Sequence, residues 1–84
     1  MMHIEDDEIL PRGEHCVVRR RSGLTGNTAH MEIPMSREEL LHRVRVYNTG
    51  ALLQQAFDNL EADLREFLLT GITPTEWKEE FSDV

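Results

Sequence analysis

Apolar and polar positions alternate over residues 15–33, with a turn between two extended stretches. Residues 15–21 contain β-branched side chains, and residues 28–33 place Ala29, Met31 and Ile33 on one face. Residues 22–27 between them hold two glycines and an asparagine, which tolerate positive φ. The pattern predicts a β-hairpin over residues 15–35. An isolated hairpin is marginal in water, so we expect it to pack on the segments that follow.

From residue 36 onward the apolar spacing changes to three and four residues, which is typical of helices. Ser36 and Glu39 form a capping box that predicts a helix extending to about Tyr47. A short second helix is expected over 51–57, and a third, which would include Leu60, ends at Gly71. One continuous helix over residues 51–70 is the open alternative, because neither Asp nor Asn at positions 58 and 59 forbids it.

The clearest local signal is the start of a last helix at Thr73. Thr73 is the expected N-cap, Pro74 occupies the first helical position, and Glu76 closes a capping box. The apolar stripe of this helix consists of Trp77, Phe81 and Val84, and its acidic residues are Glu79, Glu80 and Asp83.

These elements predict an α+β fold in which an N-terminal β-hairpin packs on three or four short α-helices. Residues 15–84 form the expected single domain. Residues 1–14 are expected to be a flexible acidic lead, because the acids of 5–8 repel one another and 11–13 has a turn composition. A small open hairpin edge also leads us to expect a homodimer. The expected core consists of Val18, Met31, Ile33, Leu40, Val44, Leu52, Phe57, Leu64, Phe67, Leu68 and Trp77, with Cys16 as a buried thiol.

The composition changes this picture little. The chain has 84 residues, of which 39% are apolar and 30% charged, as in a small globular domain. No apolar run approaches the roughly 20 residues of a membrane span, and the N-terminus lacks the apolar region of a secretory signal. The single cysteine fits a reducing compartment. We therefore expect a cytoplasmic protein without a membrane partner.

Charge is distributed unevenly along the chain. Residues 11–47 carry seven arginines against four glutamates, a net charge of +3. Residues 48–84 carry one arginine and one lysine against eight acids, a net charge of −6. The overall charge of −7 disfavours a polyanionic partner, whereas Arg19, Arg20 and Arg21, joined by Arg12, Arg43 and Arg45, leave a local basic patch open.

The sequence motifs do not support a catalytic site, a metal site or a cofactor site. His15 and Cys16 are neighbours on a predicted strand and point to opposite faces, which places His15 poorly as a base for a thiol nucleophile. The four histidines lack the local spacing of a zinc site. Residues 23–26 form a GxxG that lies between strands rather than helices, which favours a hairpin turn. We predict no enzyme, no metal and no cofactor.

Several stretches resemble a group of small, uncharacterised proteins encoded in bacteriophage and prophage genomes. The resemblance spans roughly residues 16–81 and is carried by residues 20–27, 31–34, 50–57 and, most specifically, REFLLTGITPTEW at 65–77. That group usually begins the third helix with Leu-Ser, whereas this chain has Leu60-Glu61. The resemblance implies a phage origin and a bacterial host cell, but no activity.

The favoured hypothesis is a non-enzymatic, acidic protein that binds a host or phage protein as an adaptor or inhibitor and competes with nucleic acid. A nucleic-acid-binding module that uses the arginines at 19–21 ranks lower, and a structural or assembly protein of the virion is a further alternative. The candidate interaction residues are Arg19, Arg20, Arg21, Trp77, Glu79, Glu80, Phe81 and Asp83.

Overall fold

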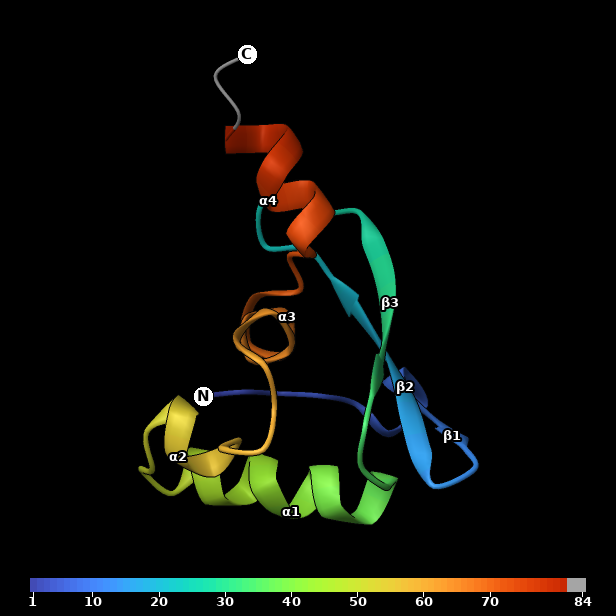
Figure 1. Cartoon of the computed structure of the whole chain (residues 1–84), viewed down its shortest axis with the longest axis vertical. Helices are drawn as coiled ribbons and strands as arrows, with labels where there is room; N and C mark the ends of the chain where they lie inside the picture. The colour runs from blue at the N-terminus through green and yellow to red at the C-terminus, as the bar shows by residue number, and fades with distance from the viewer. Residues whose placement is uncertain (82–84) are drawn as a thin grey trace.

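The structure is a computed structural model that describes residues 1–81. It contains a three-stranded antiparallel sheet in the order β1–β2–β3, formed by Ile9–Arg12, His15–Arg21 and Thr28–Ile33. The helices follow the sheet in the sequence and lie to one side of it (Figure 1). The predicted α+β fold, with an N-terminal antiparallel sheet and short helices, is confirmed.

The sheet has one strand more than the predicted hairpin. β1 pairs with β2 and places Ile9 opposite Val18, and a single 3₁₀ turn, η1 (Asp6–Glu8), precedes it. The backbone nitrogen of Met2 donates to Asn48 Oδ1, and Asn48 Nδ2 donates to the Met2 carbonyl, both at 2.8 Å. Met2 and Ile9 are buried. The prediction of a flexible lead was therefore wrong for this segment, because its apolar side chains complete the core.

The two faces of the sheet have different environments. Cys16 lies opposite Ile33 and Val18 opposite Met31 in the β2–β3 register, and these side chains face the helices. Residues at the alternate positions of the strands face solvent, because no helix among residues 1–81 covers that side (Figure 1). Pro11 lies in the edge strand β1, where its missing N–H costs no hydrogen bond within the sheet.

Four α-helices follow the sheet within residues 1–81, and their bounds agree largely with the sequence pattern. They are α1 (Arg37–Asn48), α2 (Leu53–Ala56), α3 (Ala62–Thr70) and α4 (Pro74–Phe81). Ser36 Oγ accepts the Glu39 N–H at 3.2 Å and begins α1 as predicted. Residues 51–70 contain two helices rather than one continuous helix, because Phe57 leaves the helical region at φ −125°. Leu60 is buried in the connection between α2 and α3 rather than within a helix.

The core lies between the inner face of the sheet and helices α1 to α3. Two predicted core residues are wrong: Leu52 is 58% exposed at the start of α2, and Trp77 is 39% exposed on α4. Met31 and Leu64 are half-buried at the margin of the core. The buried cluster consists of Met2, Ile9, Cys16, Val18, Ile33, Met35, Leu40, Val44, Ala56, Phe57, Leu60, Phe67 and Leu68.

Gly71 turns the chain between α3 and α4 where the backbone of β2 comes very close. Its φ is +76°, and its N–H donates to the Phe67 carbonyl to end α3. A Cβ at this position would lie 2.2 Å from the carbonyl oxygen of Arg21. The turn thus directs α4 away from the core, toward the far end of the molecule (Figure 1). None of the helices within residues 1–81 is long and apolar enough to span a bilayer.

Candidate functional site

The aromatic pair of α4 lies outside the core. Trp77 and Phe81 stack with ring centroids 4.6 Å apart, and Phe81 is 58% exposed. No residue of α4 is buried, although the other α-helices each contribute at least one buried side chain. A surface helix normally turns its apolar stripe toward the core, so this stripe is available to a partner.

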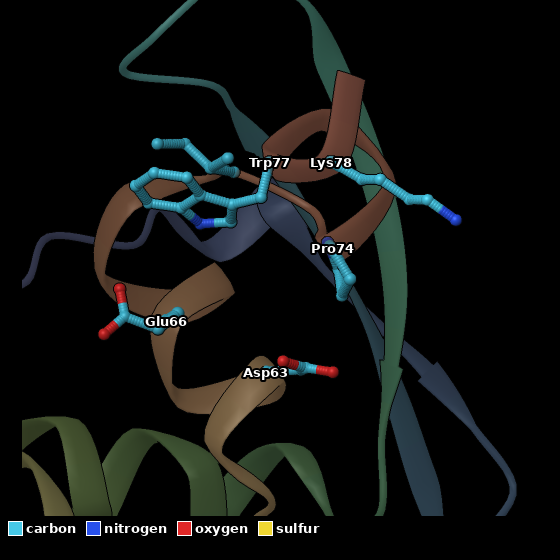
Figure 2. Close-up of a pocket in the computed structure, with 6 residues that line it drawn as sticks. Asp63, Glu66, Pro74, Trp77 and Lys78 are labelled. Carbon is cyan, nitrogen blue, oxygen red and sulfur yellow. The ribbon is translucent and has the colours of Figure 1, made fainter. Parts of the chain in front are cut away.

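A groove of about 630 Å³ opens beside Trp77, between α3 and α4. Ile72, Pro74 and Trp77 make its apolar part, and Figure 2 shows the indole ring lying across the groove above α3. Asp63 and Glu66, one helical turn apart on α3, provide carboxylates at the rim. Within residues 1–81 neither carboxylate makes an ion pair. The groove therefore combines an aromatic surface with two unpaired carboxylates, and Lys78 of α4 also lines it.

Polar contacts to the β2–β3 loop hold α4 in place. The Glu76 N–H donates to Thr73 Oγ1 at 3.1 Å, as the predicted cap requires. The Glu76 carboxylate does not close the capping box but accepts hydrogen bonds from the hydroxyls of Ser22 and Thr25, the latter at 2.6 Å. Ser22 Oγ in turn accepts from the backbone N–H groups of residues 24 and 25. These bonds position α4 and with it the groove.

The acidic residues predicted on the last helix are partly placed. Glu79 and Glu80 are exposed on α4 and lie beyond the groove. Asp83 and Val84 lie outside the described residues. Sequence reasoning missed Asp63 and Glu66 as site residues. Asp63 and Glu66 are three residues apart and therefore share one face of α3. The only signal in the sequence that α4 would turn back above this face was that Gly71 ends α3 just before a capping signal.

The three consecutive arginines of β2 separate by strand alternation. Arg19 and Arg21 are exposed on the outer face of the sheet. Arg20 faces inward, and its side chain is only 15% exposed. Its guanidinium donates to the His3 carbonyl at 2.7 Å and lies 3.9 Å from Glu8. The prediction of Arg20 as an interaction residue is therefore corrected, because the N-terminal segment covers it.

The wider basic patch is smaller than expected. Arg43 is used internally, since it bonds Glu39, Asp58 and the Ala56 carbonyl between α1 and α2. Arg45 lies on α1 rather than on the sheet. Arg12 shares that outer face with Arg19 and Arg21, because it lies opposite His15 in the β1–β2 register.

The thiol and the histidines have structural surroundings. Cys16 is fully buried, and burial raises the pKa of its thiol. His15 Nδ1 lies 2.8 Å from Glu32 Oε2 on the surface of the sheet. Within residues 1–81, no group of three or more His, Cys, Asp or Glu side chains is arranged to hold a metal ion.

Glu32 offers a test of this surface contact. The hydrogen bond with His15, aided by the charge of Arg12, lowers the pKa of the Glu32 carboxyl below its ordinary value of 4.5. Its carboxylate therefore favours the folded state above pH 4.5, and this contribution is lost as the pH falls through the lowered pKa. We expect His15→Gln to raise the pKa of Glu32 in a carboxyl NMR titration, and Arg12→Gln to raise it less. An unchanged Glu32 pKa in His15→Gln would contradict the contact.

No protein-family model, curated protein or solved structure matches this chain. Two stretches that lie far apart in the sequence, residues 20–27 and 65–77, meet in the structure. The Gly23 N–H donates to the Thr70 carbonyl at 2.9 Å, and Glu76 bonds the hydroxyls of the same loop. Both stretches therefore build one unit around the base of α4.

Proposed function

We propose that this chain is a small, phage-type, non-enzymatic protein that binds a host or phage protein through α4 and the adjacent groove. The observation that carries the proposal is the stacked pair of Trp77 and Phe81 on a helix that buries no side chain. Large aromatic side chains dominate the binding energy of protein interfaces, and Trp is enriched at their centres. The groove beside Trp77 supplies the concave surface that such an interface needs.

The charge of this end of the molecule supports a basic partner. Asp63 and Glu66 line the groove, and Glu79 and Glu80 are exposed on α4. The best-fitting partner segment has an apolar side chain that packs on Trp77 and flanking Lys or Arg residues that meet the carboxylates. Residues 48–84 carry a net charge of −6, which speeds association with a basic surface. Where that surface normally contacts nucleic acid, this protein would compete for it as an inhibitor.

The test is capture of a partner by the tagged chain from nuclease-treated bacterial lysate, followed by titration with the identified protein. We expect Trp77→Ala/Phe81→Ala to weaken binding at least about 30-fold, which corresponds to the loss of a hot spot of about 2 kcal/mol. Neither side chain belongs to the buried cluster, so the rest of the domain should keep its fold, as circular dichroism would show.

A matched control removes two exposed apolar side chains elsewhere. Leu10→Ala/Leu52→Ala acts at β1 and at the start of α2, and neither residue lines the groove, so binding should be unchanged. Asp63→Asn/Glu66→Gln should weaken binding and reduce its dependence on salt. The absence of any captured protein, or equal capture by the aromatic variant, would reject the proposal.

A further inference from the structure

The outer face of the sheet is a second surface, separate from the groove. No helix of the described part of the chain covers it, and it points away from α1, α2 and α3 (Figure 1). Arg19 and Arg21 are exposed on this face of β2, and Arg12 lies on the same face of β1. In the β2–β3 register His30 lies opposite Arg19, and Thr28 lies opposite Arg21. The tertiary structure thus collects cationic and hydroxyl side chains that the sequence separates.

The composition of this face differs from that of the groove. Among the strand residues 9–12, 15–21 and 28–33 there is no Trp, Tyr or Phe. Glu32 is the single carboxylate among those residues, and it lies near the His15 end of β2, where His15 bonds it. The opposite end, with Arg19 and Arg21, has no acid among the strand residues. A face without aromatic anchors is poorly suited to a protein hot spot, whereas arginines bind phosphate well.

From these observations we infer that the outer face of the sheet binds the phosphate backbone of a single-stranded nucleic acid. Arg19 and Arg21 are two residues apart on one strand, which places their Cα atoms about 7 Å apart on the same side of the sheet. Arg21 Nε donates to the Gly26 carbonyl at 3.1 Å, so the side chain is held at the loop while its terminal nitrogens remain free to donate. Arg12 adds a third cation at the other end of the strands, where Glu32 also lies.

The negative charge of the whole chain does not prevent this contact. The acids of the C-terminal half are concentrated on α3 and α4, on the other side of the sheet or beyond its end (Figure 1). Glu76, the acid of α4 nearest the β2–β3 loop, accepts hydrogen bonds from Ser22 and Thr25. Exposed charges further apart than about 8 Å are largely screened at physiological ionic strength. Because no aromatic side chain stacks on a base, binding should be independent of sequence.

The experiment is a fluorescence anisotropy titration of a labelled oligothymidylate with the full chain. Neutralisation of three phosphates of a single strand predicts a log–log salt slope of about −2, so affinity should fall about 20-fold between about 50 and about 200 mM salt. In Arg19→Gln/Arg21→Gln the slope should shrink to about −0.7, and binding at low salt should weaken at least about 10-fold. Duplex DNA of the same length should bind more weakly, because this flat face offers no element that enters a groove.

The matched control is Arg45→Gln/Lys78→Gln, which changes the net charge equally but alters α1 and α4. It should bind the oligonucleotide like the wild type. Thermal unfolding of each variant shows that loss of binding is not loss of folding. No binding by the wild type, or equal loss in both double variants, would overturn the inference. The groove proposal stands apart from this result, because Trp77→Ala/Phe81→Ala should bind oligothymidylate unchanged.

Discussion

Replacing Gly71 with alanine is expected to destabilise this domain more than any other single methyl group added to a glycine. The new Cβ would lie 2.2 Å from the Arg21 carbonyl oxygen and 2.7 Å from its carbon, both backbone atoms that no side-chain rotation can move. Either β2 or the end of α3 must shift, and the residue must also keep φ at +76°. We expect a loss of at least about 4 kcal/mol, against a total stability of about 4 to 13 kcal/mol for a chain of this length.

Gly13→Ala separates the two contributions to that loss, which are the steric clash and the positive φ. Gly13 also has positive φ, at +63°, but a Cβ there would meet nothing within 4 Å. Gly13→Ala should therefore show only the backbone penalty of about 1–2 kcal/mol. Chemical denaturation of both variants measures the difference, which reports the close approach of α3 to β2. Equal stability of the two variants would show that the end of α3 does not lie this close to β2.

Replacing Glu76 with alanine is expected to lower the free energy of unfolding by about 2–3 kcal/mol. Its carboxylate accepts the hydroxyl protons of Ser22 and Thr25, and Ser22 is only 5% exposed. Without the carboxylate, the buried Ser22 hydroxyl loses its acceptor and α4 loses its attachment to the β2–β3 loop. Partner binding through the groove should weaken in the same variant, because Trp77 would no longer be held above α3.

The matched control for Glu76 lies on the same helix. Glu79 is exposed, and its side chain makes no hydrogen bond or ion pair within residues 1–81, so Glu79→Ala should change stability by less than about 0.5 kcal/mol. Urea denaturation followed by tryptophan fluorescence and by circular dichroism distinguishes detachment of α4 from unfolding of the whole domain. A Glu76→Ala variant as stable as the Glu79→Ala variant would mean that the loop and α4 are joined by other contacts.

The sequence predicted those elements whose signals are local. Ser36 and Thr73 cap their helices through side chains three residues from the N–H groups they accept, so the information is contained within one turn. The alternation of apolar and polar residues over 28–33 likewise predicted correctly which side chains of β3 face inward and which face outward. In each case the structure depends on neighbours within a few residues.

The errors arise where distant segments decide the outcome. Ile9–Arg12 is short and contains Pro11, and it becomes a strand because β2 offers an open edge and the core accepts Ile9. Arg20 is a charged residue of a type that usually faces solvent, but it faces inward, since strand alternation places it on the side of Val18. Trp77 has the character of a core residue, yet Gly71 turns its helix away from the core.

The candidate site was predicted only in part for the same reason. Trp77, Phe81, Glu79 and Glu80 belong to one helix and could be read from its sequence. The groove needs α3 and α4 to approach each other, which depends on Glu76 reaching a loop 54 and 51 positions earlier in the chain, at Ser22 and Thr25. Nothing in the local pattern of α4 indicates that its capping glutamate bonds a distant hydroxyl pair.

The bonds between distant segments also determine when the protein can fold during its synthesis. Met2 bonds Asn48 across 46 positions, so this contact of the N-terminal segment cannot form until the end of α1 has left the ribosome. The loop after β2 must wait longer still, because its Ser22 hydroxyl finds its acceptor only when Glu76 emerges. Closing such long loops costs entropy that local contacts do not repay. The nascent chain therefore reaches its final form only when α4, the proposed binding element, has been translated, so that folding and acquisition of the binding site are completed together.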